Sequence, residues 1–288
     1  MAFDQLVPQT PIYPPEAETY AGEALKLSRA AAREMNLVAD VPYGPHPAHK
    51  LDIYAPSGAR AGSLPVLIFA HGGAWTHGYK EWMGLMAPPI VATPAIFVSI
   101  DYRLGPDFRF PDPVMDCIAA LAWVRENIAP YGGDPARLFV GGHSAGAHLF
   151  ALAVLREDLL REQGITPSHV KACLPVSGQM DMRFRTVPPG SGEEYIQSMF
   201  LRDLGDAEAA SPRAYAEGCQ VPMFFAVGSD DIPRIVKSNM AMVRALRRAG
   251  HTAELMVLQG YNHFDTTLEA RRGDNRWVRR ARKWLTRD

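Results

Sequence analysis

The sequence predicts an α/β protein built on one mostly parallel sheet with helices on both faces. Short apolar stretches recur along the chain, and several are continuously apolar, which is typical of strands buried on both sides. Helical patterns lie between them, so strand and helix alternate through most of the 288 residues. This alternation favours a single domain over residues 1–288 rather than two domains.

The expected elements follow in order from a proline-rich start. A helical pattern covers about residues 16–35, so residues 1–40 are expected to form an N-terminal helical segment. Further helical patterns cover residues 113–128, 145–158 and 234–250, and an amphipathic pattern closes the chain over 277–285. The strand-like stretches are KLDIYAP, LPVLIFAHGG, AIFVSIDYRL, RLFVGGHS, VKACLPVSG, VPMFFAVGSDD and AELMVLQGYNH.

One stretch, residues 179–220, interrupts the alternation. It is rich in Pro, Gly, Met and charged residues, and connections this long usually carry short helices or a function. We expect this insertion to cover one end of the sheet, and a peripheral insertion is the alternative.

Composition excludes several classes of function. A net charge of −1 gives no electrostatic basis for binding nucleic acid or an anionic membrane. The three cysteines, Cys117, Cys173 and Cys219, are too few and too scattered for a disulfide framework or a zinc site, so no metal is expected. The sequence shows no signal-peptide pattern and no stretch of 18 apolar residues, so we expect a cytoplasmic protein.

The motif Gly142-His143-Ser144-Ala145-Gly146 fits G-x-S-x-G, the pattern of a nucleophile on a tight strand-to-helix turn. An apolar stretch precedes it and a helical pattern follows it, as that turn requires. A glycine-rich bend with an inert serine is the alternative, and the ends of the other strands argue against it.

Three other strand-like stretches end in residues that would complete an acyl-transfer site, since the carboxyl ends of parallel strands meet at one edge. His263 ends the last stretch and is the histidine best placed to act as general base. An aspartate that orients it would be Asp230 or Asp231; adjacent side chains point in opposite directions, so only one can face His263.

HGGAW, residues 71–75, would supply an oxyanion hole. Backbone N–H groups of Gly73 and Ala74 would act together with that of Ala145, which follows the nucleophile. A simple tight turn is the alternative for this stretch.

Taken together, these motifs resemble the α/β-hydrolases of the hormone-sensitive-lipase-like esterase branch, including kynurenine formamidase and its relatives. The resemblance rests on HGGAW, DYRLGPDFRFPDPVMDC, YGGDPARLFVGGHSAGAHL, SGQMDM, VGSDDIP and GYNHFD. It implies an eight-stranded sheet and assigns the acid to Asp231, which gives Ser144, Asp231 and His263 as the triad. Many esterases of this branch have a third glycine where Ala74 stands, and this departure favours the formamidase-like subgroup.

We therefore expect a serine hydrolase that cleaves small or medium carboxylic esters through an acyl-enzyme, without a cofactor. An arylformamidase acting on an N-formyl aryl amide is the nearest alternative, and a non-catalytic ligand-binding protein on the same scaffold is another. The expected partner is a small ester or amide. Residues expected to line an apolar substrate pocket are Trp75, Met180, Met182 and Phe184.

Overall fold

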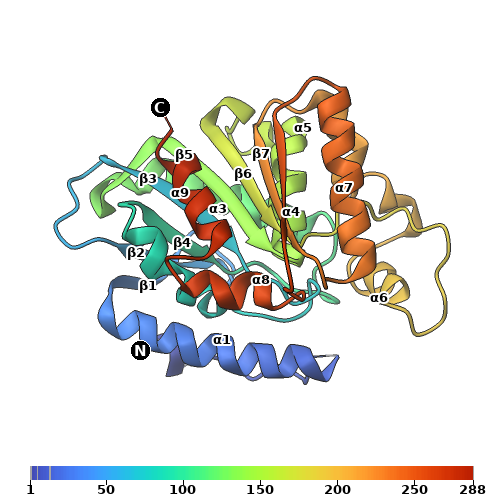
Figure 1. Ribbon diagram of the computed structural model, residues 1–288, viewed down its shortest axis with the longest axis horizontal. Helices are drawn as coiled ribbons and strands as arrows, with labels where there is room; N and C mark the ends of the chain where they lie inside the picture. Colours follow the sequence, from blue (N-terminus) through green and yellow to red (C-terminus); the bar gives the residue numbers. More distant parts are fainter. Residues whose placement is uncertain (1, 5, 13, 288) are drawn as a thin grey trace.

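An eight-stranded sheet lies at the centre of the computed structural model, which describes residues 2–4, 6–12 and 14–287 (Figure 1). The strand order is β1-β2-β4-β3-β5-β6-β7-β8. Strands β3 to β8 run parallel to one another, whereas β2 pairs antiparallel with both β1 and β4. The strands are β1 (Asn36–Pro42), β2 (Lys50–Ala55), β3 (Leu64–Ala70), β4 (Ile96–Ile100), β5 (Gly133–His143), β6 (Val170–Val176), β7 (Met223–Gly228) and β8 (Ala253–Leu258).

The mostly parallel sheet is confirmed. Six of the seven apolar stretches contain a whole strand, and RLFVGGHS covers the carboxyl-terminal part of β5. The remaining strand, β1, lies at the edge of the sheet and directly follows the N-terminal helix. Its sequence NLVADVP mixes polar and apolar residues, and none of its side chains is fully buried. This strand lacks the continuous apolar stretch by which the buried strands were recognised.

Helices cover both faces of the sheet, and the side chains of each strand alternate between them. Val66 and Ile68 of β3 belong to a core shared with α3, α4 and α7, whereas Leu67 and Phe69 belong to one shared with α1 and α9. Full burial of each such side chain stabilises the fold by roughly 1.5–3 kcal/mol. These helices are α1 (Pro15–Glu34), α3 (Asp112–Asn127), α4 (Ala145–Leu155), α7 (Pro233–Arg248) and α9 (Arg276–Leu285).

Shorter helices connect these elements. They are α2 (Ala87–Val91), α5 (Glu157–Glu162), α6 (Gly192–Met199) and α8 (Asp265–Leu268). The 3₁₀ turns are η1 (Ala2–Asp4), η2 (Lys80–Met86), η3 (Ala129–Tyr131), η4 (Pro167–His169), η5 (Leu204–Ala207), η6 (Pro212–Gly218) and η7 (Glu269–Arg271). The stretch 179–220 thus contains α6, η5 and η6, as expected for an insertion with short helices of its own. Over the described ranges, none of the helices combines the length and apolar character needed to cross a membrane.

The parallel strands direct the candidate functional residues to one edge of the sheet. Strands β3, β5, β7 and β8 all point the same way, so the loops that follow them lie at their common carboxyl ends. Helix α1 passes beside α8 near this edge (Figure 1). The hydroxyl oxygens of Tyr20 and of Thr267 in α8 lie 3.3 Å apart.

Candidate active site

Ser144 lies on the tight turn between β5 and α4, in a backbone conformation that is rare for a residue with a side chain. Its φ is +50° and its ψ is −112°. The turn leaves no room for side chains around it: a Cβ on Gly146 would lie 2.3 Å from the carbonyl oxygen of Ala70. A strained turn that is fixed by close packing is a feature of nucleophile elbows, and it holds the serine hydroxyl above the sheet edge.

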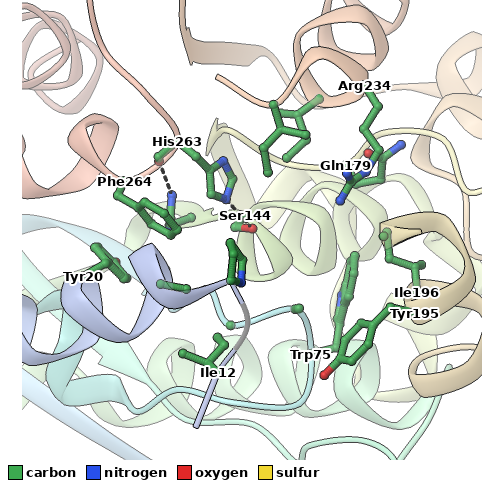
Figure 2. Close-up of a pocket in the computed structure, with 18 of the residues that line it drawn as sticks. Ile12, Tyr20, Trp75, Ser144, Gln179, Tyr195, Ile196, Arg234, His263 and Phe264 are labelled. Atoms are coloured by element: carbon green, nitrogen blue, oxygen red, sulfur yellow. Dashed lines mark hydrogen bonds between the residues drawn. The ribbon is translucent and has the colours of Figure 1, made fainter. Parts of the chain in front are cut away.

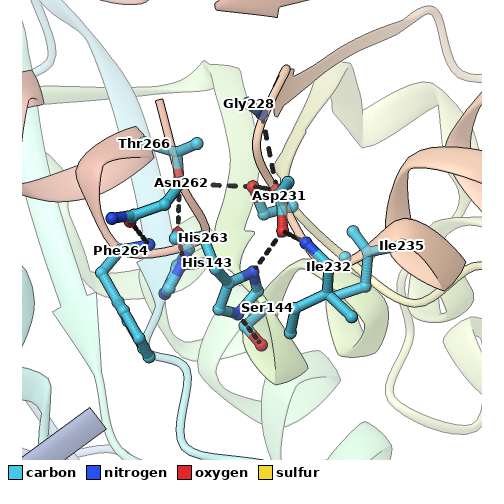
Figure 3. A network of polar contacts seen from close by, with 12 residues as sticks. His143, Ser144, Gly228, Asp231, Ile232, Ile235, Asn262, His263, Phe264 and Thr266 are labelled. Carbon is cyan, nitrogen blue, oxygen red and sulfur yellow. Dashed lines mark hydrogen bonds and ion pairs between the residues drawn. The ribbon is translucent and has the colours of Figure 1, made fainter. Parts of the chain in front are cut away.

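The structure brings Ser144, His263 and Asp231 into one hydrogen-bonded chain (Figure 3). Nε2 of His263 lies 2.9 Å from Oγ of Ser144, and Nδ1 of His263 lies 2.8 Å from Oδ1 of Asp231. A carboxylate at Nδ1 keeps the proton on that nitrogen and leaves Nε2 as the acceptor for the serine proton. This arrangement can activate Ser144 as a nucleophile.

Asp231 is held as a carboxylate by four donors. Its Oδ1 accepts from His263 and from the backbone N–H of Ile232 at 2.7 Å. Its Oδ2 accepts from the Ser177 hydroxyl at 2.6 Å. It also accepts from the N–H of Gly228 at 3.4 Å (Figure 3). Burial acts to raise the pKa of Asp231, but these hydrogen bonds and the nearby His263 together lower the pKa below its usual range. The carboxylate therefore stays ionised in the buried site.

Asp230 takes no part in this network. Its side chain is exposed and accepts a hydrogen bond from the Ser229 hydroxyl at 2.9 Å. Of the two adjacent aspartates, only Asp231 faces His263.

The HGGAW loop lies directly against Ser144. A Cβ on Gly72 would lie 3.1 Å from Cβ of Ser144. The φ angles of Gly73 and Ala74 are +115° and +51°, and both residues line the cavity that contains Ser144. None of the hydrogen bonds found among the described residues uses the N–H of Gly73 or Ala74, and Ala145 begins α4, where an N–H has no partner within the helix. These three donors are free for an oxyanion.

Buried histidines support the loop and the turn. His71 stacks on Tyr102, with ring centroids 4.4 Å apart, and the Tyr102 hydroxyl donates to the His71 carbonyl at 2.9 Å. Nε2 of His143 lies 3.0 Å from the backbone carbonyl oxygen of His263. This contact fixes the backbone of His263, the candidate catalytic base. Burial lowers the pKa of His71 to about 4, and burial together with the neighbouring His263 lowers the pKa of His143 to about 3. Both rings are therefore neutral supports near neutral pH rather than proton carriers.

Ser144 opens into a cavity of about 380 Å³ (Figure 2). Its wall combines the HGGAW loop, Ser144 and His263 with three segments far apart in sequence: residues 12 and 14–20, residues 190–196, and residues 232–235. Most of the lining is apolar. The lining residues with the largest apolar side chains are Ile12, Tyr20, Trp75, Trp82, Tyr195, Ile196, Ile232, Ile235 and Phe264.

The expected pocket residues divide into one that lines this cavity and three that do not. Trp75 lines it, whereas Met180, Met182 and Phe184 are not part of its wall. Met180 and Met182 are fully buried in the core, and Phe184 packs against that core. The expectation for these three residues was wrong. After β6 the chain first packs into the core, and only later, at residues 190–196, does it reach the cavity wall.

Several residues of the site were not identified from the sequence. Ser177 supports Asp231, and the only signal was its place directly after a strand, in SGQMDM. Gln179 and Arg234 line the cavity, and Tyr20 reaches it from α1. No local pattern in the sequence marks them, because their role depends on how distant segments meet.

Within residues 2–4, 6–12 and 14–287, no three His, Cys, Asp or Glu side chains are grouped so that they could hold a metal ion. The three cysteines are buried and free.

The sheet order, the strained serine turn and the Ser-His-Asp chain define the protein as an α/β-hydrolase. The family model BD-FAE matches residues 51–243, and the chain belongs to this family. The resemblance to esterases of the hormone-sensitive-lipase-like branch is thereby confirmed.

Curated relatives carry esterase names. The chain is 31% identical over 242 residues to isoprenylcysteine alpha-carbonyl methylesterase of Arabidopsis thaliana, covering 79% of this chain and 56% of that protein. It is 35% identical over 223 residues to esterase LipQ of Mycobacterium tuberculosis, covering 73% of this chain and 53% of that protein. The chain thus spans little more than half the length of these relatives.

Solved structures share the fold over nearly the whole chain. The carboxylesterase EstE1, cloned from a metagenomic library, aligns with a TM-score of 0.73 at 22% identity, covering 93% of this chain and 96% of that one. A putative thioesterase from Silicibacter aligns with a TM-score of 0.76 at 20% identity, covering 96% and 95%.

Proposed function

We propose that the protein is a carboxylesterase that cleaves small or medium carboxylic esters through an acyl-enzyme on Ser144. The observation that carries the proposal is the chain from Ser144 through His263 to Asp231, with separations of 2.9 and 2.8 Å, at the wall of a mostly apolar cavity. The esterase names of the relatives agree with this activity.

In the first half of the reaction, the Ser144 oxygen attacks the ester carbonyl while its proton passes to Nε2 of His263. The carbonyl oxygen becomes negatively charged and accepts hydrogen bonds from the N–H groups of Gly73, Ala74 and Ala145. His263 then gives its proton to the departing alcohol oxygen, the C–O bond breaks, and the acyl group remains on Ser144.

In the second half, a water molecule attacks the acyl carbon and gives its proton to His263. The bond to the Ser144 oxygen breaks, that oxygen takes the proton back, and the carboxylic acid leaves. Asp231 stabilises the imidazolium form of His263 in both halves and fixes the ring orientation.

Residues 1–288 act as one domain in this proposal, and two segments restrict access to Ser144. Residues 179–220 contribute Gln179 and the stretch 190–196 to the cavity wall, and the N-terminal segment contributes Ile12, Pro14, Ala17 and Tyr20. Both segments therefore cover the active site and limit the size of the ester that enters.

Replacement of the nucleophile tests the activity. Purified wild-type protein is expected to hydrolyse p-nitrophenyl acetate and butyrate, and Ser144→Ala is expected to lower kcat by roughly a thousandfold or more. A fluorophosphonate probe should label Ser144 in the wild-type protein only. Absence of both labelling and ester hydrolysis in the folded wild-type protein would remove the proposal, and faster turnover of N-formylkynurenine than of these esters would assign the site to a formamide instead.

The adjacent aspartates provide a matched test of the acid. Asp231→Asn is expected to lower kcat by roughly a hundredfold or more, because an amide at this position favours the wrong tautomer of His263. Asp230→Asn is expected to retain activity because its side chain is exposed. The reverse result would transfer the role to Asp230.

A further inference from the structure

Arg234 places a positive charge on the wall of the cavity that contains Ser144. It is the second residue of α7 and, among the described lining residues, the one with a permanently charged side chain. A Cβ on Gly192 of α6 would lie 3.1 Å from Nη1 and 3.2 Å from Nη2, so the absence of a side chain there leaves room for the guanidinium. Figure 2 shows Arg234 across the cavity from His263 and Phe264.

No described carboxylate pairs with this guanidinium. Its Nε–H is buried without a hydrogen-bond partner among the described residues. Burial lowers the pKa of Arg234, and the more distant charges of Glu193 and Asp231 oppose that shift only in part. The Asp231 oxygens already accept hydrogen bonds from four other donors. The guanidinium is therefore partly desolvated and has no counterion. Desolvating a charge costs free energy unless a bound ligand supplies the opposite charge.

Gln179 adds a second unpartnered polar group to the same cavity wall. Its side chain is almost fully buried, with a residue exposure of 5%. Nε2 donates to the backbone carbonyl of Asp181 at 2.6 Å, which assigns the amide orientation, and Oε1 has no partner among the described residues. A buried acceptor left in this state favours a ligand that brings a donor.

The remaining wall of the cavity restricts what that ligand can be. No aspartate or glutamate is among the described lining residues, and large apolar side chains such as Trp75, Ile196 and Ile235 make up most of it. A ligand that fits is apolar along most of its length and carries one anionic group. The planar guanidinium matches a carboxylate through two parallel hydrogen bonds.

We propose that the cavity selects esters whose acyl part carries a carboxylate remote from the scissile carbonyl, with Arg234 binding that carboxylate. Oε1 of Gln179 accepts a hydrogen bond from a hydroxyl or N–H group beside it. The proposal rests on the esterase function proposed above and names its substrate class.

Paired substrates test the charge directly. The monomethyl esters of C5 to C8 dicarboxylic acids are compared with the methyl esters of the unsubstituted acids of equal length, and methanol release gives kcat/KM for each. The expected result is a preference for at least one acidic ester over its neutral partner, and a fall of that ratio by about tenfold or more in Arg234→Gln. Arg234→Lys should retain part of the preference because it keeps the charge.

Arg244→Gln is the matched control, since Arg244 is exposed on the same helix and its loss changes the net charge equally. It should leave the ratio unchanged. Equal kcat/KM for acidic and neutral esters at every chain length, or the same ratio in wild type and Arg234→Gln, would overturn the proposal while leaving the esterase function intact.

Binding without turnover separates the two proposals. Calorimetry on folded Ser144→Ala is expected to show tighter binding of the preferred monomethyl ester than of its neutral partner, and about tenfold weaker binding when Arg234→Gln is added. This difference is expected even if no ester is hydrolysed by the wild-type protein. Its absence in proteins with unchanged thermal unfolding counts against Arg234.

The role of Gln179 has its own test. A monomethyl ester with a hydroxyl beside the carboxylate is compared with the one that lacks it. Wild-type protein should favour the hydroxylated ester, and Gln179→Met should lower that preference about threefold to tenfold. An unchanged preference in Gln179→Met would refute the hydrogen bond to Oε1.

Discussion

His148 offers a measurable link between the pH and the stability of the active-site region. It lies on α4, one turn after Ser144, and both of its ring nitrogens are bonded. Nδ1 accepts from the indole N–H of Trp75 at 3.2 Å, and Nε2–H donates to the carbonyl of Ala210 at 2.8 Å. In its neutral form the ring thus joins the HGGAW loop to the stretch 179–220, and a proton on Nδ1 would break the bond to Trp75.

The size of the effect follows from the pKa. Burial is the largest cause and lowers the pKa of His148 to about 4, whereas an unfolded chain has the ordinary value of about 6.5. The unfolded state therefore binds the proton more readily, and stability contributed by the neutral ring is present above about pH 6.5 and is lost as the pH falls toward 4. Between pH 7 and pH 5, these two values give a loss of about 2 kcal/mol in the free energy of unfolding from this ring alone.

Urea unfolding at pH 7 and pH 5 measures this loss, and His148→Gln removes the titrating group. The fall in unfolding free energy between the two pH values should be smaller in the variant by about 2 kcal/mol. Val154→Ala is the control: Val154 is buried in the same helix, so the variant should be less stable at both pH values and keep the wild-type fall. An equal fall in wild type and His148→Gln would refute the neutral, buried state of this ring.

Two further predictions concern the support of the triad and the turn. Ser177→Ala removes the 2.6 Å hydrogen bond to Asp231 and is expected to lower kcat/KM for p-nitrophenyl butyrate by about tenfold. Ser229→Ala removes the hydrogen bond to the exposed Asp230 and should leave kcat/KM unchanged. Equal effects of the two variants would contradict the support of Asp231 by Ser177. Gly146→Ala would place a Cβ 2.3 Å from the Ala70 carbonyl oxygen, so thermal unfolding should show a loss of about 3 kcal/mol or no folded protein, and a wild-type melting temperature would contradict this geometry.

The residues of the site that could be predicted from the sequence lie directly after apolar stretches that mark the strands. Ser144, His263 and Asp231 each follow a mainly apolar stretch, and parallel strands bring such ends together whatever the details of packing. Periodicity also located the long helices: α7 covers Pro233–Arg248 against a pattern over 234–250, and Gly250 adopts a φ of +83° just beyond the end. The choice of Asp231 over Asp230 required the family resemblance, because residue type and position are nearly identical for both.

The part that was not predictable depends on contacts between distant segments. Met180 and Met182 are apolar and follow a strand end, and residues that line a pocket share both properties. Only the path of the chain after β6 places these two side chains in the core. Arg234 lies three residues after Asp231 in a helical pattern, where an arginine usually faces solvent. Its place on the cavity wall becomes visible only when α6 approaches α7 with a glycine at the contact.

The location of these residues separates the reaction from the choice of substrate. The groups that would act on the carbonyl come from the turn after β5 and the loops after β3, β7 and β8, which the sheet fixes relative to one another. The groups that would contact the rest of the substrate come from residues 12 and 14–20, residues 190–196, and residues 232–235, which lie outside the sheet. Arg234 connects the two sets because it lies in the first turn of the helix that follows Asp231. A change at Arg234 should therefore alter which ester is preferred, whereas a change at Asp231 should slow every ester alike.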